Sequence, residues 1–440
     1  MVIEEAQRKA RIPGLVVAVS VGGERAAVCR GTTVAGSAIP MIPAARFQIG
    51  CITKVLTCAV AMQLAHEGTI DLDAPIDEYL PNLAAPAEAR GIRVRDLGTH
   101  TSGYLGLNPS NPEHGRFYSW PKFVEFFRHT PQVFRPGTVF NSEHTECVIL
   151  GEVIRRVAGV PCETLVRDLI LEPLQLATGT VERDAGQPEV RVADHSLDRA
   201  SGEYATVRSV PYCDFWASSL SPTTASPVDL VTIGEMLCGM RHVPGICAEA
   251  LDDVRRQVVE VPRASGGTER EISPYRFGFG CGEFAPGVFG RNGSARGQTL
   301  GLRFSPRQKV VVVVGINCWD VYARDSLLDS VLHMLLPELA AGHDAPQGDP
   351  ELNVNDLEGT YTGCVPGVQI AVTRSGGGLA CAIGGLIGGS AQKLNVEVLF
   401  DETGELRVSS PMKHLALGFF REKGTGAPAM RVGLNAFRKA

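Results

Sequence analysis

Residues 47–68 read FQIGCITKVLTCAVAMQLAHEG. Apolar side chains recur at helical spacing from Ile52 to Leu64, and the glycine at position 68 is a typical helix stop. The pattern therefore predicts a long, largely buried helix that begins near Cys51 and ends at Gly68.

Cys51 and Lys54 lie in the first turn of this predicted helix. Unpaired backbone N–H groups and the helix dipole stabilise negative charge at a helix start, so a thiolate is favoured there. Lys54 follows one turn later on the same face, where an amine can assist removal of the thiol proton. A C-x-x-K spacing alone is common by chance, so the interpretation depends on the sequence around it.

The flanking segments predict a sheet whose strands come from both ends of the chain. Residues 14–20 and 24–31 form a strand pair around a Gly-Gly turn, and further strands are expected at 275–284, 299–307 and 309–317. Helices are expected at 145–159, 226–239 and 326–339. We predict an α+β fold, an α/β sandwich with an antiparallel sheet from 12–48 and 274–338 and a helical insert over about 70–270.

The C-terminal part of the chain has a different pattern. Residues 342–352, GHDAPQGDPEL, are polar and rich in Gly and Pro, which is typical of a linker. Short alternating segments follow, among them VQIAVTR, LNVEVLF, ELRVSS and MRVGLNAF. We therefore expect a domain at 1–341, a linker at 342–352 and a small antiparallel β-barrel at 353–440.

Composition and charge exclude several classes of function. The chain has 440 residues, with 42 Lys and Arg against 48 Asp and Glu, and its basic residues are scattered, so a nucleic-acid partner is not expected. The N-terminus does not resemble a signal peptide, and the longest apolar run, at 310–316, is too short to span a bilayer. We expect a cytoplasmic protein with no membrane partner.

Twelve cysteines lie singly along the chain, with no C-x-x-C pair and no Cys/His cluster of zinc spacing. This pattern indicates reduced thiols, most of them small buried apolar residues. No metal site and no cofactor are expected.

Four segments together resemble the serine β-lactamase and penicillin-binding-protein superfamily, in particular its class C β-lactamase-like, esterase and acyltransferase branch. Residues 47–81 follow the family's Ser-x-x-Lys helix, and residues 95–103, RDLGTHTSG, are similar to its Leu-Leu-x-His-Thr-Ser-Gly segment. Residues 135–159 are similar to the segment with the Tyr-x-Asn motif, and residues 289–317 to the strand with Lys-Thr-Gly or His-x-Gly. The resemblance covers nearly all of 1–340, and the tail resembles a lipocalin-like domain that some members carry.

The motif positions depart from the family pattern. Cys51 replaces the acylated serine, while Lys54 is retained. The second motif falls on Ser142-Glu143-His144, and the third on Arg291-Asn292-Gly293. Linked changes of this kind indicate altered chemistry, and they argue against a cysteine introduced only to trap a substrate.

The resemblance implies acyl transfer, with the backbone N–H of Cys51 and one near Ser294 as the oxyanion hole. A cysteine nucleophile would form a thioester acyl-enzyme. Exchange with a small-molecule acyl donor, including a thioester of coenzyme A or a carrier protein, would then be nearly thermoneutral. A transferase with a small-molecule acceptor, of use in biosynthesis, is our leading hypothesis.

The roles of the other motif residues stay open at this point. His144 either acts as base, with Glu143 or Glu146 orienting its ring, or only replaces a substrate hydrogen bond. Ser142 either holds a water or substrate group or makes room, and Arg291 either clamps a carboxylate or phosphate or forms an ion pair. His100 is expected to be structural. The competing functions are a thiol-dependent esterase, amidase or peptidase and a non-catalytic binding protein.

Overall fold

The computed structural model describes a little over three quarters of the chain, and every structural statement below refers to those residues. The predicted linker at 342–352 lies outside them, as do parts of 104–135 and 185–215. The described ranges are 2–83, 91–104, 119–130, 132–176, 179–180, 190–198, 201–207, 217–219, 221–261, 274–295, 297–340, 354–363, 369–375, 378–384, 386–387, 390–391, 394–400, 406–409, 417–422, 425–432 and 435–440.

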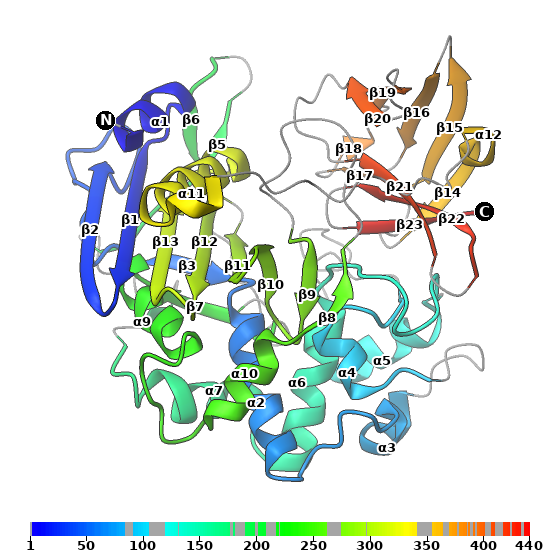
Figure 1. The fold of residues 1–440 in the computed structure, drawn as a ribbon, viewed down its shortest axis with the longest axis horizontal. Coiled ribbons are helices and arrows are strands. Elements are labelled where there is room, and N and C mark those ends of the chain that lie inside the picture. Colours follow the sequence, from blue (N-terminus) through cyan, green and yellow to red (C-terminus); the bar gives the residue numbers. More distant parts are fainter. Residues whose placement is uncertain are drawn as a thin grey trace. The chain divides into compact units, whose positions relative to one another are not determined.

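The chain forms two compact units, each assembled from several separate segments. Unit 1 consists of Met1–Ile70, Leu150–Gln257 and Gly278–His343. Unit 2 consists of Asp71–Ile149, Val258–Phe277 and Asp344–Ala440. The two units are described one at a time, with the element labels of Figure 1.

Unit 1 is built on an antiparallel sheet with strands from both ends of the chain, as predicted. β1 (Gly14–Val21) and β2 (Glu24–Gly31) form a hairpin around Gly22 and Gly23, whose φ values of 60° and 97° favour glycine. The order continues β2-β1-β13-β12-β11-β10. The added strands are β10 (Gly282–Ala285), β11 (Val288–Ala295), β12 (Gln298–Ser305) and β13 (Val310–Ile316). Most residues of β8 (Gln257–Glu260) and β9 (Arg276–Gly278) belong to unit 2.

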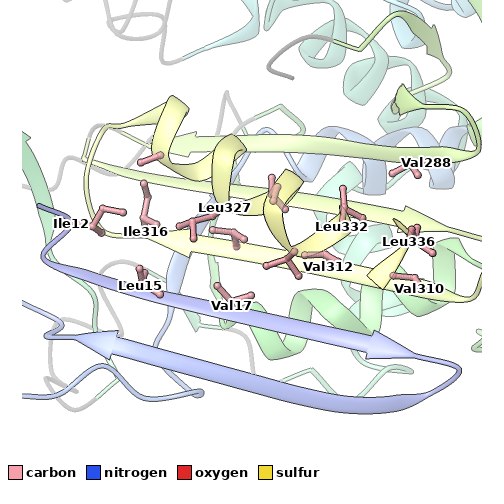
Figure 2. Close-up of a cluster of buried hydrophobic side chains, with 14 of the residues drawn as sticks. Ile12, Leu15, Val17, Val288, Val310, Val312, Ile316, Leu327, Leu332 and Leu336 are labelled. Carbon is pink, nitrogen blue, oxygen red and sulfur yellow. The ribbon is translucent and has the colours of Figure 1, made fainter. Parts of the chain in front are cut away.

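Helices cover both faces of this sheet. α11 (Val321–Leu335) packs on one face, where Leu327, Leu332 and Leu336 meet alternate residues of β1 and β13 (Figure 2). α9 (Pro227–Leu237) lies on the other face, where Gly234 approaches Val311. α1 (Val2–Ala10) contributes Ile3 and Ala6 to the edge of the α11 core. The predicted α/β sandwich is confirmed.

The helix predicted from residues 47–68 is α2 (Thr53–His66), and 11 of its 14 residues are buried. It follows β3 (Phe47–Gly50), which pairs with β7 (Ser221–Ala225), and β7 pairs in turn with β4 (Gly179–Thr180). The insert also holds β5 (Asp194–Leu197), β6 (Tyr204–Val207), α7 (Cys162–Val166), the π-helical turn Arg167–Leu171 and α10 (Ala248–Arg255). Strands of two to five residues are too short to show alternation, so the sequence did not separate them from loops. Among the described residues, no helix is long and apolar enough to cross a bilayer.

Unit 2 combines short helices with a C-terminal sheet. The helical elements are α3 (Ile76–Tyr79), the 3-10 turn Pro81–Leu83, α4 (Val94–Gly98), α5 (Trp120–Arg128) and the start of α6 (Thr145–Ala158). The sheet has the order β20-β19-β16-β15-β14-β23-β22-β21 and is a curled antiparallel half-barrel. Its strands are β14 (Gly359–Gly363), β15 (Gln369–Ser375), β16 (Gly378–Gly384), β19 (Leu394–Phe400), β20 (Leu406–Ser409), β21 (Leu417–Arg421), β22 (Pro428–Val432) and β23 (Asn435–Lys439), beside the small pair β17 (Leu386–Ile387) and β18 (Ser390–Ala391).

The C-terminal sheet packs against the segment that leads to the second motif. Phe134 and Val139 share a buried cluster with Phe420, Ala429 and Ala436. The backbone N–H of Ala436 donates to Asn141 Oδ1 at 3.2 Å, and Arg438 Nη1 donates to the carbonyl of Val133 at 3.2 Å. Within unit 2, residues 133–141 are therefore held partly by the C-terminal sheet.

His195 is fully buried in unit 1, at the start of β5. Its Nδ1 lies 2.6 Å from the carbonyl oxygen of Asn317, and its Nε2 accepts a hydrogen bond of 2.9 Å from the backbone N–H of Ala35. A ring that donates through one nitrogen and accepts through the other is neutral. Burial lowers the pKa of His195 below its ordinary value, although the hydrogen bond to Asn317 opposes this shift.

Because the folded-state pKa of His195 is lowered, the unfolded chain binds more protons near pH 6 than the folded chain does. The contribution of His195 to stability is therefore complete above the ordinary histidine pKa of about 6.5 and is lost as the pH falls below it. We expect the stability difference between the wild type and His195→Gln to shrink between about pH 7.5 and about pH 5.5. Denaturant unfolding at both pH values measures it. The exposed His333→Gln variant is the control, and a pH-independent difference for His195→Gln would contradict the assignment.

Candidate active site

Two glycines bring the end of β3 into backbone contact with β11 in unit 1. Gly50 has a φ of 52°, and a β-carbon there would lie 2.5 Å from the carbonyl oxygen of Ser294 and 2.8 Å from its nitrogen. A β-carbon at Gly293 would lie 2.2 Å from the carbonyl oxygen of Ile49. These distances are too short for any side chain, so only glycine allows this crossing.

Cys51 follows Gly50 directly and is one of the partly exposed cysteines. Its carbonyl accepts a hydrogen bond of 3.1 Å from the N–H of Lys54, so the chain is already turning at Cys51. The N-cap residue of α2, Ile52, makes no side-chain cap, and its own N–H and that of Val55 donate to the carbonyls of Ile49 and Ile52 at 3.2 and 3.1 Å. The helix dipole favours negative charge at this end of α2. Cys51 thus lies directly before the N-cap of α2 rather than in its first turn, and its role as nucleophile stays a prediction.

Lys54 lies in the first turn of α2 and is 1% exposed. An ammonium group that is removed from water to this degree is costly unless polar groups surround it. Burial of a lysine one turn from a half-buried thiol is unusual for a purely structural helix. The two residues are thus kept together by one helical turn.

Arg291 and Gly293 lie on the same face of β11, because side chains alternate along a strand. Arg291 is 6% exposed, and its Nη1 donates to the carbonyl of Gly280 at 3.3 Å. Gly280 in turn lies against Cys58 of α2, since a β-carbon there would be 2.7 Å from Cys58 Cβ. The Arg291 guanidinium therefore lies on the face of β11 that is directed to α2, where it donates a hydrogen bond to a backbone carbonyl.

Asn292 has its side chain on the opposite face of β11. Its Oδ1 accepts a hydrogen bond of 2.8 Å from Arg303 Nη1, and its Nδ2 lies 3.5 Å from Asp325 Oδ1. Ser294, two residues further on, is half-buried, and its backbone faces Gly50. Within unit 1 the structure thus places Gly293 and Ser294 against the end of β3 that leads into Cys51, with Arg291 on the Gly293 face of β11, whereas the Asn292 side chain points to the opposite face.

The second motif belongs to unit 2, where it precedes α6. Ser142 and His144 are half-buried, and Glu143 is 5% exposed. Glu143 accepts from the N–H of His144 at 2.7 Å and from the N–H of Glu146 at 3.1 Å, so its carboxylate caps the start of α6. The pairing of His144 with Cys51 stays a prediction.

His100, Ser102 and Glu146 form a buried network behind this motif. His100 is fully buried, has a φ of 56°, and its Nδ1 lies 2.5 Å from Glu146 Oε2. The hydroxyl and the backbone N–H of Ser102 donate to Glu146 Oε1 at 2.5 and 3.0 Å. Burial and the nearby Glu143 carboxylate raise the pKa of Glu146 well above its ordinary value. The expected structural role of His100 fits this arrangement.

The remaining thiols differ from Cys51 in their surroundings. Burial raises the pKa of four of them to about 12, namely Cys238, Cys281, Cys318 and Cys381. Cys29 and Cys247 are the other partly exposed cysteines in the described part of the chain. Within that part, no three His, Cys, Asp or Glu side chains gather so that they could hold a metal ion.

Two structural features of the site were not predicted from the sequence. The need for glycine at position 50 depends on a strand that lies more than 200 residues later. Arg303 and Asp325, which contact Asn292, were also missed, although an arginine inside the apolar segment TLGLRFS was a usable signal. A charged residue in a strand that is otherwise buried needs a partner, because charged side chains are almost never fully buried unless they are paired.

Comparison with known proteins identifies the relatives of this chain. The family model described as Beta-lactamase matches residues 2–328. Penicillin-binding protein 4 of Amycolatopsis lactamdurans is 28% identical over 372 residues, which is 80% of this chain and 93% of that protein. Esterase EstB of Burkholderia gladioli is 27% identical over 313 residues, 63% of this chain and 77% of the esterase.

The fold is also found among solved structures. The crystal structure of SurE is similar with a TM-score of 0.76 and 21% identity, and the match covers 100% of this chain and 98% of that one. The match includes the C-terminal sheet as well as the segments around Cys51. At this identity the similarity concerns the fold alone.

Because Gly50 and Gly293 lie at one backbone contact, we expect a methyl group at either position to lower the free energy of unfolding strongly. Gly50→Ala combines a disfavoured φ with overlap on Ser294, and Gly293→Ala overlaps Ile49, so each should lower the free energy of unfolding by about 2–5 kcal/mol. Gly68→Ala is the matched control, because Gly68 has a φ of 73° with no atom within 4 Å of its β-carbon position. It should cost only about 1 kcal/mol.

The double variant Gly50→Ala/Gly293→Ala tests whether the two glycines act on the same contact. Once one alanine has moved β11 away from β3, the second should cost less than it does alone, since both act on one contact. Additive losses, or a Gly68→Ala loss as large as that of Gly50→Ala, would contradict the proposed contact.

The raised pKa of Glu146 predicts that its neutral form is tolerated in the folded protein. Glu146→Gln keeps the size and most hydrogen bonds, so it should cost less than about 1.5 kcal/mol at neutral pH. Glu146→Ala leaves His100 and Ser102 without their shared acceptor and should cost about 3–5 kcal/mol. Denaturant unfolding distinguishes the two, and equal losses would mean that the charge of Glu146 is required.

Proposed function

The chain belongs to the Beta-lactamase family, and from this premise we propose that it is a cysteine-dependent acyl-transfer enzyme. Cys51 would carry the acyl group as a thioester and pass it to a small-molecule acceptor. The observation that supports this most is the contact of the Ser294 backbone with Gly50, beside Cys51 and one helical turn from the buried Lys54.

In the proposed first step the side chain of Lys54 acts as general base and takes the proton of the Cys51 thiol. The thiolate attacks the carbonyl carbon of the donor, the C–S bond forms, and the bond to the leaving group breaks. The leaving group departs with the proton from Lys54. The oxyanion of the tetrahedral intermediate would be stabilised by the backbone N–H groups of Cys51 and Ser294.

In the second step an acceptor attacks the thioester and gives its proton to Lys54 as the thiolate leaves. A thioester donor on coenzyme A or a carrier protein suits this sequence, because thioester exchange is close to thermoneutral. Arg291, the cation of the third motif, would bind a carboxylate or phosphate of such a donor.

The second motif would serve the acceptor step. His144 is half-buried at the start of α6, and its backbone is fixed by the Glu143 carboxylate. An imidazole at this position would orient the incoming nucleophile through a hydrogen bond, while Lys54 takes the proton. We expect Ser142 to accept a water or a substrate group, because its side chain is smaller than the tyrosine that the resemblance implies at this position.

Hydrolysis is the second candidate, and the similarity to Esterase EstB favours it. Water would then take the place of the acceptor, and the acyl-enzyme would be short-lived. The two functions share the first step and differ only in what removes the acyl group.

The shared step predicts an acyl adduct on Cys51. We expect intact mass spectrometry of the protein with acyl thioesters, and with p-nitrophenyl acetate, to show one added acyl group that peptide mapping assigns to Cys51. Cys51→Ala should abolish it, and Lys54→Met should slow it by about 100-fold, since general-base assistance contributes about 10²–10⁴.

Cys29→Ser and Cys247→Ser are the matched controls, because those thiols are also partly exposed, and both should acylate normally. An unmodified Cys51 that reacts with iodoacetamide like a free thiol would support the non-catalytic alternative instead. Release of the acyl group by amines or thiols faster than by water would separate transfer from hydrolysis.

A further inference from the structure

Strand β11 is held from both faces at the third motif. On one face Gly293 and Ser294 lie against the end of β3. On the other face the side chain of Asn292 lies between Arg303 and Asp325. The backbone N–H assigned to the oxyanion hole is therefore only two residues from a second set of contacts that does not touch Cys51.

Arg303 is 1% exposed and is bound from several directions. Its Nη1 donates to Asn292 Oδ1 at 2.8 Å and to the carbonyl of Leu302 at 3.0 Å, and its Nη2 to Asp325 Oδ1 at 3.4 Å. Its guanidinium carbon lies 3.4 Å from the ring centre of Phe284 in β10. Arg303 thus links three strands, and burial lowers its pKa to about 10 against the opposing effect of Asp325.

Asp325 lies on α11, is 2% exposed, and joins the helix to this cluster. Arg324 donates to it through Nε at 3.0 Å and Nη2 at 2.5 Å. Two glycines make room for these side chains. A β-carbon at Gly290 would lie 3.0 Å from Arg303 Cδ, and one at Gly301 would lie 3.3 Å from Asn292 Oδ1.

Such a cluster is a weak source of stability, because removing charges from water costs about as much as their attraction returns. Buried ion pairs are better suited to fixing one register among several alternatives. Here the alternatives are small shifts of β11 along β12, where Asn292 pairs with Gly301 and Ser294 with Thr299.

We propose that Arg303 and Asp325 are positioning residues that act through Asn292 to hold the Ser294 N–H at the oxyanion site. The catalytic part of this inference rests on the proposed acyl transfer. The part that concerns the position of β11 does not depend on that function. A displacement of the strand by a fraction of an ångström would weaken the hydrogen bond to the oxyanion but leave Cys51 itself in place.

Two reactions of Cys51 test the proposal. Acylation by p-nitrophenyl acetate passes through an oxyanion, whereas alkylation by iodoacetamide does not. Arg303→Met should slow acylation by about 10- to 100-fold at saturating ester and leave alkylation unchanged. Asp325→Asn, which keeps the shape of the cluster, should give a smaller loss of the same kind. Equal losses in both reactions, or no loss in either, would overturn the proposal.

Arg25→Met is the matched control, because Arg25 pairs with the buried Glu235 on the opposite face of the same sheet. It should leave the ratio of acylation to alkylation at the wild-type value. A loss of acylation as large as that of Arg303→Met would overturn the proposal.

Amide hydrogen exchange supplies a readout that does not depend on the reaction. The peptide spanning 288–295 should exchange about tenfold faster in Arg303→Met and at the wild-type rate in Arg25→Met. Unchanged exchange in Arg303→Met would overturn the positioning role. A wild-type protein that p-nitrophenyl acetate does not acylate would overturn the proposed function instead, and the exchange experiment would still decide the position of β11.

Discussion

Backbone contact between Gly50 and Ser294 is the constraint on which the rest of unit 1 depends. It requires a positive φ at Gly50 and no side chain at Gly293. Given these conditions, the chain turns at Cys51 and enters α2, so that the thiol and the N–H of Ser294 belong to one corner of the unit. The reactive position follows from steric exclusion at two glycines.

Buried charge surrounds this corner and recurs in the second motif of unit 2. Lys54 is buried one helical turn after Cys51, Arg303 and Asp325 contact Asn292 of β11, and Glu146 lies beside His100. Each group costs free energy to bury, and none is needed for a stable core, which apolar side chains such as those around α11 supply. We infer that these buried charges restrict the alternative positions that a strand, a helix start or a loop could take.

Much of this could be predicted from the sequence, because local patterns specify it. The valine run at 310–316, the spacing of α2 and the Cys51–Lys54 pair each follow from residues near one another. The role of Gly50, the direction of the Asn292 side chain and the contact of Val139 with the C-terminal sheet could not be predicted. Each depends on a partner that is distant in the sequence, and a single sequence contains no signal for such a contact.

We propose above all that the Ser294 N–H is held where an acyl group on Cys51 develops negative charge. A crystal structure of the protein with a stable acyl group on Cys51 tests it most directly. We predict that the acyl oxygen lies about 2.7–3.1 Å from the backbone nitrogen of Ser294 and from that of Cys51. An acyl oxygen that points into solvent, with no backbone N–H within hydrogen-bond distance, would contradict the claim.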